Sequence, residues 1–143
     1  MQDAKIYYQR FGRHCFQTLK DYHFESRIKT GHPFDSTHLS YDGNGQFIIK
    51  KGRCSDGPSD DIINPFEVTQ NFFRGAFEHD AKYWAMRSGS ITADVWRKTA
   101  DQELKERIMQ DGMSIARAEA VYLAVREFGE NSTLGGNPIL EAP

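Results

Sequence analysis

A histidine and an aspartate stand where a helix is expected to bury apolar side chains. His79 and Asp80 are adjacent, and each belongs to a row of mainly aromatic residues spaced three or four positions apart. Side chains at that spacing share one face of an α-helix, and such a face normally packs into the core. Burying a polar group there is costly unless the group is paired, so both residues should have partners. The two rows are Phe72, Ala76, His79, Tyr83 and Met86, and Phe73, Phe77, Asp80 and Trp84.

Asp101 is the leading candidate for the partner of His79. Only the short segment 88–90 separates the first predicted helix from the next, so the two helices can lie antiparallel and bring Asp101 across. A carboxylate on one imidazole nitrogen fixes the tautomer and leaves the other nitrogen as an acceptor. This layout is that of a general base that activates water. It would make His79 and Asp101 catalytic residues.

Asp80 should serve a different partner, because it points about 100° around the helix from His79. It could reach the acidic loop at Asp56. Two carboxylates with loop carbonyls suit a hard cation such as Ca²⁺ and are poor zinc ligands. Asp80 and Asp56 are therefore candidate metal ligands, with Ca²⁺ as the candidate cofactor. The alternative for residues 56–61 is a plain solvated turn.

The same residues are also compatible with a purely structural role. A buried His-Asp-Asp set that only fixes helix packing through hydrogen bonds would show the same pattern. Exposure of these side chains at the surface is a further alternative. The residue pattern leaves the catalytic and structural interpretations open.

The elements that must position these residues change character near residue 64. Before it, partial alternation predicts four short strands, at 15–19, 22–26, 37–41 and 46–50, with a hairpin turn at 42–45. After it, the spacing predicts three helices, from about 65 or 69 to 87, from 93 to 109, and from Ser114 as N-cap to Gly129 as stop. The expected fold class is α+β, with short N-terminal antiparallel strands followed by a three-helix C-terminal part.

The 143 residues fit one domain, 1–143. It comprises a β-rich part over about 1–63, a helical part over 64–129, and a Gly- and Pro-punctuated tail, 130–143, that is expected to be loose. Cys15 and Cys54 are expected to be separate thiols in a reducing compartment, although a bridge between them stays open.

Charge and composition argue against nucleic acid as a partner and against a transmembrane segment. The chain carries 18 basic and 20 acidic residues for a net charge of −2, which gives no electrostatic reason to expect nucleic acid. It has no run of about 18 apolar residues, so no transmembrane segment is expected. The first residues also lack the apolar core of a signal peptide.

Four motifs follow one another along the chain: Ser55-Asp56-Gly57-Pro58-Ser59, His79-Asp80-Ala81-Lys82-Tyr83, Arg97-Lys98-Thr99-Ala100-Asp101 and Tyr122-Leu123-Ala124-Val125-Arg126-Glu127-Phe128-Gly129. In their order and spacing they resemble a family of tailed-bacteriophage and prophage proteins classified as a domain of unknown function. The likeness covers roughly residues 15–129, and it implies a phage origin, partners among other phage proteins or the virion, and a location in the host cytoplasm or the virion. Lys82 departs from the family, which usually has an apolar residue there, and this favours a more exposed turn.

The His-Asp-x-x-Tyr helix followed by an Asp helix also resembles secretory phospholipase A2. That resemblance implies His79 as the base, Asp80 as a calcium ligand and Asp101 as the residue that orients His79, with a lipid or ester as substrate. The dense cysteine framework of that family is missing here, and its glycine-rich calcium loop is echoed only by Asp56-Gly57.

The leading functional hypothesis is a phage-encoded accessory protein with a phospholipase-like hydrolytic site, in which a cation at Asp80 and Asp56 stabilises the oxyanion. The alternative is a non-catalytic virion-associated or assembly protein whose His and Asp residues form a structural network. A third hypothesis is a small cytosolic binder of a host protein.

Overall fold

The computed structural model describes residues 5–10, 16–55 and 70–134. Within them, two small antiparallel sheets precede three helices, which confirms the predicted α+β class. The strands are β1 (Tyr8–Arg10), β2 (Phe16–Thr18), β3 (Tyr22–Glu25), β4 (Phe34–Asp35), β5 (Leu39–Tyr41), β6 (Gln46–Ile49) and β7 (Cys54–Ser55). The helices are α2 (Gln70–Arg87), α3 (Ala93–Gln110), α4 (Ile115–Phe128) and the 3-10 helix η1 (Glu130–Thr133).

The strands form one sheet in the order β1-β2-β7 and a second in the order β3-β6-β5-β4. In the second sheet, Tyr22 pairs with Ile49 and Phe24 with Phe47. All four of these side chains are buried, whereas the intervening His23 of β3 is exposed. Because side chains alternate along a strand, one face of this sheet packs on the core and the other faces solvent.

The predicted hairpin turn at 42–45 joins β5 to β6. Both Gly43 and Gly45 have positive φ, at 84° and 94°, a conformation that favours glycine. The side chain of Asp42 accepts hydrogen bonds from the backbone N–H groups of Asn44 and Gln46, at 2.7 and 3.0 Å. The turn therefore aligns the strands that the alternation pattern predicts.

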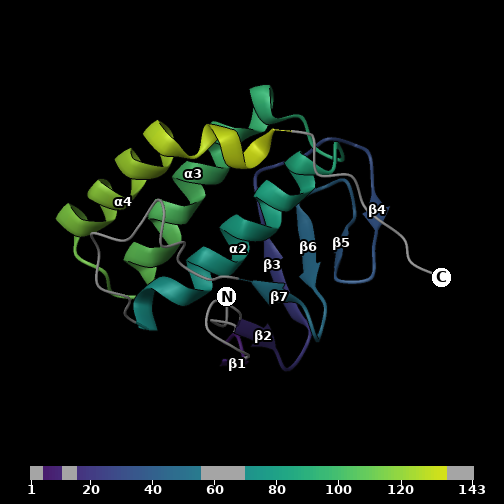
Figure 1. Ribbon diagram of the computed structural model, residues 1–143, viewed down its shortest axis with the longest axis horizontal. Coiled ribbons are helices and arrows are strands. Elements are labelled where there is room, and N and C mark those ends of the chain that lie inside the picture. The colour runs from purple at the N-terminus through teal and green to yellow at the C-terminus, as the bar shows by residue number, and fades with distance from the viewer. Residues whose placement is uncertain (1–4, 11–15, 56–69, 135–143) are drawn as a thin grey trace.

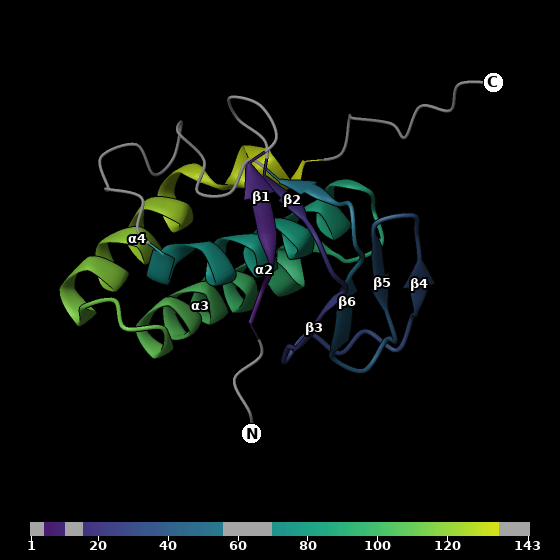
Figure 2. The same ribbon diagram turned by 90° about the horizontal axis from the view of Figure 1, so that it is seen from below.

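Helix α2 is the central element of the described structure. Figure 1 shows α3 and α4 on one side of α2 and the strands β3 to β6 on the other. Figure 2 shows β1 crossing α2, where Tyr8 of β1 stacks on Phe73 of α2. Phe73 and Phe77 of α2 belong to the core cluster shared with the strands, and Phe72 and Ala76 belong to the cluster shared with α3 and α4. This helix therefore has buried side chains toward both layers.

A row of charged residues on α2 also packs against α3. Arg74, Glu78 and Lys82 follow one another at four-residue intervals, and each is buried. Their partners are spaced in the same way on or just after α3, in the reverse order expected of antiparallel helices. The pairs of this ion-pair ladder are Arg74 with Asp111, Glu78 with Arg107, and Lys82 with Glu103.

The expectation that Lys82 marks an exposed turn is wrong. Its side chain is 1% exposed. The ammonium lies 3.5 Å from a carboxylate oxygen of Glu103 and 5.5 Å from the centroid of the Phe24 ring. A carboxylate and an aromatic face together make burial of this cation tolerable.

Of the tail 130–143 and the two cysteines, the structure describes residues 130–134 and Cys54. Glu130–Thr133 forms η1, and the guanidinium of Arg87 donates to the carbonyl of Ser132 at 2.8 Å. Cys54 is an exposed free thiol, and Cys15 lies outside the described residues, as do 135–143. Among the described helices, none combines the length and apolar character needed to span a bilayer.

Candidate functional site

The structure brings His79 of α2 and Asp101 of α3 into direct contact. His79 Nε2 lies 2.7 Å from Asp101 Oδ1. The turn between the helices contains Gly89 with a φ of 82°, which lets the chain reverse and lie antiparallel. The side chain of Asp101 is fully buried, whereas that of His79 is 12% exposed.

Asp101 is the common acceptor of a network that joins all three helices. Tyr83 on α2 donates its hydroxyl to Oδ1 at 2.5 Å, and Arg126 on α4 donates Nη1 to Oδ2 at 2.8 Å. Arg97, one turn before Asp101 on α3, places its Nε 4.0 Å from Oδ2. A buried carboxylate is tolerated when its oxygens are bonded in this way.

These neighbours also determine the ionisation of the network. Burial alone would raise the pKa of Asp101, but the hydrogen bonds from His79, Tyr83 and Arg126 hold it below its ordinary value. Burial, assisted by the negative charge of Asp101, raises the pKa of the Tyr83 hydroxyl. At neutral pH the pair therefore consists of an anionic acceptor and a neutral phenol donor.

The ring of His79 is oriented with one nitrogen inward. Nε2 contacts Asp101, and no described residue forms a hydrogen bond with Nδ1. The ring also lies against Tyr83, with centroids 4.1 Å apart. The residual exposure of the side chain means that it is not sealed inside aromatic packing. The arrangement can therefore accept a proton at Nδ1 while Asp101 holds the ring in place.

Asp80 faces away from this network, as the helix geometry predicts. Its Oδ2 lies 3.1 Å from Nη2 of Arg53, which precedes β7. The Arg53 side chain is 7% exposed, and its guanidinium carbon is 5.7 Å from the centroid of the Trp84 ring. Asp56 lies outside the described residues, so its predicted pairing with Asp80 remains a prediction.

Metal ligation by Asp80 would need more than this carboxylate. Within the ranges 5–10, 16–55 and 70–134, no three His, Cys, Asp or Glu residues are grouped so that they could hold a metal ion. The Asp80 carboxylate, which was expected to bind Ca²⁺, contacts the guanidinium of Arg53. Because its expected co-ligand Asp56 lies outside the described residues, a Ca²⁺ site at Asp80 and Asp56 stays a prediction.

Four residues of the site were not identified as such from the sequence. Tyr83 lies four residues after His79 and Arg97 four residues before Asp101, a spacing that places each pair on one helix face. That spacing is a signal that could have identified both. Arg126 and Arg53 come from distant parts of the chain, and no local pattern indicates their partners.

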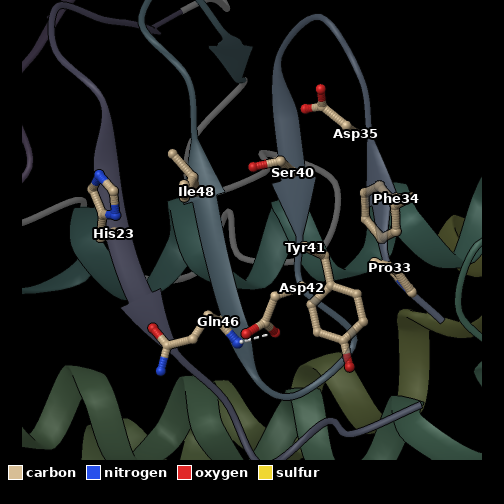
Figure 3. Close-up of a pocket in the computed structure, with 9 residues that line it drawn as sticks. All are labelled: His23, Pro33, Phe34, Asp35, Ser40, Tyr41, Asp42, Gln46 and Ile48. Atoms are coloured by element: carbon tan, nitrogen blue, oxygen red, sulfur yellow. Dashed lines mark hydrogen bonds between the residues drawn. The ribbon is translucent and has the colours of Figure 1, made fainter. Parts of the chain in front are cut away.

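Two cavities in the described structure lie elsewhere. One, of about 510 Å³, opens on the outer face of the second sheet, where His23, Ser40 and Ile48 stand side by side across β3, β5 and β6 (Figure 3). The other, of about 570 Å³, lies between the β5–β6 turn and Glu103 of α3. Neither is lined by residues of the Asp101 network.

The comparisons with known proteins identify no relative of this chain. No family model matches the chain, and neither the curated proteins nor the solved structures contain a significant match.

Proposed function

We propose that this protein is a hydrolase that acts on esters, with His79 as its general base. The contact of 2.7 Å between His79 Nε2 and Asp101 Oδ1 is the observation that carries the proposal. An anionic, immobile carboxylate on one ring nitrogen favours the tautomer whose other nitrogen accepts a proton. The network around Asp101 supplies both properties, because three side chains bond the carboxylate.

In this proposal Nδ1 of His79 takes a proton from a water molecule as the water oxygen attacks the ester carbonyl carbon. The imidazolium that forms is stabilised by Asp101, which stays ionised. As the tetrahedral intermediate collapses, the carbon–oxygen bond to the alcohol breaks, and the proton passes from Nδ1 to the departing alkoxide. The products are a carboxylic acid and an alcohol.

The test is the hydrolysis of p-nitrophenyl esters and of phosphatidylcholine vesicles by wild type and by His79→Ala. General-base catalysis contributes about 10²–10⁴-fold, so the variant should lose at least about 10²-fold in kcat. Its circular dichroism spectrum should remain that of a folded protein. His23→Ala is the matched control, because His23 is exposed on the outer sheet face and should keep full activity.

The hydrolase proposal fails if wild type turns over neither substrate and His79→Ala melts the protein. That outcome would support the second candidate, a non-catalytic virion-associated or assembly protein. The full burial of Asp101 on α3 and its hydrogen bonds to α2 and α4 favour such a structural network. The resemblance to phage proteins suggests other phage proteins as partners and the virion or host cytoplasm as location. Detection of the protein in purified virions would distinguish these locations.

A further inference from the structure

We propose that Asn44 is a site of slow, spontaneous deamidation, by which the chain converts its own β5–β6 turn into an aspartyl and an isoaspartyl form. The substrate is the side-chain amide of Asn44, the attacking atom is the backbone nitrogen of Gly45, and the co-reactant is water. The inference does not rest on the proposed hydrolase, because neither residue belongs to the Asp101 network.

Both reacting groups are free in the folded turn. The Asp42 carboxylate accepts the N–H groups of Asn44 and Gln46 and leaves the Gly45 N–H between them without an acceptor among the described residues. The side-chain amide of Asn44 likewise bonds none of them, and Asn44 is exposed. Both residues line the hollow of about 570 Å³ beside the turn, which gives water access and ammonia an exit.

The turn requires the glycine but not the asparagine. Gly45 has a φ of 94°, and a Cβ there would collide with the carbonyl oxygen of Ser26. The same lack of a side chain leaves the Gly45 nitrogen open to the amide that precedes it. Asn44 does not have a positive φ, so the backbone imposes no need for its side chain. The sequence contains no other Asn-Gly pair.

In the reaction the Gly45 nitrogen gives up its proton and bonds to Cγ of Asn44. The bond from Cγ to Nδ2 breaks, and the nitrogen takes up a proton and leaves as ammonia, which closes a succinimide ring. Water then adds to one of the two ring carbonyl carbons, and the bond from that carbon to the nitrogen breaks. Opening at Cγ gives aspartate, whereas opening at the backbone carbonyl carbon gives isoaspartate.

The isoaspartyl form should weaken the turn. It lengthens the main chain by one carbon between the two N–H groups that share the Asp42 carboxylate at 2.7 and 3.0 Å, so both hydrogen bonds cannot persist unchanged. The Gly45 carbonyl also accepts from the Ser26 N–H at 2.8 Å, and Ser26 Oγ donates to Glu103 of α3 at 2.6 Å. The change therefore affects contacts between the turn and the helix layer.

The experiment incubates wild type in mildly acidic and in mildly alkaline buffer and follows Asn44 and Asn131 by peptide mass spectrometry. Asn131 is the internal control, because it is also exposed but the Ser132 N–H donates to the Gly129 carbonyl at 3.1 Å. Releasing that hydrogen bond raises the barrier, so Asn44 should react about fivefold or more faster than Asn131. Alkaline buffer should accelerate the reaction, because the attacking nitrogen must lose its proton.

Anion exchange separates the products, since each carries one more negative charge than wild type. The isoaspartyl fraction should melt about 3 °C or more below wild type. Asn44→Asp is the matched control, because it adds the charge without lengthening the main chain, and it should melt close to wild type. Asn44→Gln should suppress the reaction at this position. Equal rates at Asn44 and Asn131 would overturn the proposal, as would an isoaspartyl fraction as stable as Asn44→Asp.

Discussion

At the scale of single residues, Asp101 determines the properties of the site. Its carboxylate has no exposed surface, and it bonds His79, Tyr83 and Arg126. Removing one partner from a buried charged network leaves the other groups uncompensated, which costs more than the pair contributes when intact. The charge of Asp101 therefore serves stability and the orientation of His79 together.

Asp101→Asn should lower the free energy of unfolding at pH 7 by about 3–5 kcal/mol, because it leaves Arg126 facing a neutral amide. The pKa of Asp101 is lowered in the folded state, so its contribution is present above the unfolded-state pKa of about 4 and is lost as the pH falls through the folded-state value. The difference in the free energy of unfolding between wild type and Asp101→Asn should therefore become smaller below about pH 4. Urea denaturation across that range measures it.

Asp94→Asn is the control for this prediction, since Asp94 lies on the same helix with an exposed side chain. Its free energy of unfolding should stay within about 1 kcal/mol of wild type, because only the favourable position of a carboxylate in the first turn of α3 is lost. If the free energy of unfolding of Asp101→Asn differs from that of wild type by the same amount from pH 7 to pH 2, the charge of Asp101 is not what stabilises the fold.

At the scale of elements, contacts between consecutive helices could be predicted from the sequence, whereas partners from distant parts of the chain could not. The spacing of His79 and Asp101 placed both on helix faces that meet, and Asp42 with its glycines indicated the hairpin. The predicted strands do not include β1, β4 or β7, and β4 and β7 have only two residues, too few for alternation to show. Arg53 was missed because its partner Asp80 is 27 residues away, and neither position signals the other.

The ion-pair ladder between α2 and α3 was predictable in principle. Charges of alternating sign recur every four residues on α2, and complementary charges recur at the same interval along α3. The charged row was missed because the same helix carries two rows of mainly aromatic residues, and these dominate its hydrophobic pattern. The ladder aligns the two helices along their length, and this register brings His79 opposite Asp101.

The close approach of α2 and α3 makes Gly75 a sensitive position. A Cβ there would lie 2.7 Å from Ile108 Cγ2 and 3.2 Å from Leu104 Cδ1. Alanine would favour the helix by about 1 kcal/mol, but overpacking of a core costs about 1–3 kcal/mol. Gly75→Ala should therefore lower the free energy of unfolding, as measured in urea.

Ile108→Ala removes the atom that such a Cβ would meet, so it provides a double-mutant cycle. The cost of Gly75→Ala should shrink or reverse in the Ile108→Ala background. An unchanged cost would show that the loss does not arise from this contact.

At the scale of the whole molecule, α2 makes the sheet layer and the helix layer depend on each other. Phe77 is buried in the cluster shared with the strands, and Leu104 of α3 is buried in the cluster shared with α4. Since both clusters contain side chains of α2, neither layer can lose its packing without exposing one face of that helix. The described parts of the chain should therefore unfold in one cooperative step.

Phe77→Ala and Leu104→Ala test this coupling from opposite sides. Each should cost about 2–5 kcal/mol, because each leaves a cavity at a fully or almost fully buried site. Near-ultraviolet circular dichroism, which reports the aromatic packing around the strands, should follow the same urea curve as the far-ultraviolet signal of the helices in both variants. If Phe77→Ala instead separates the two curves, the layers are independent, and the alignment of His79 with Asp101 would then depend on the helices alone.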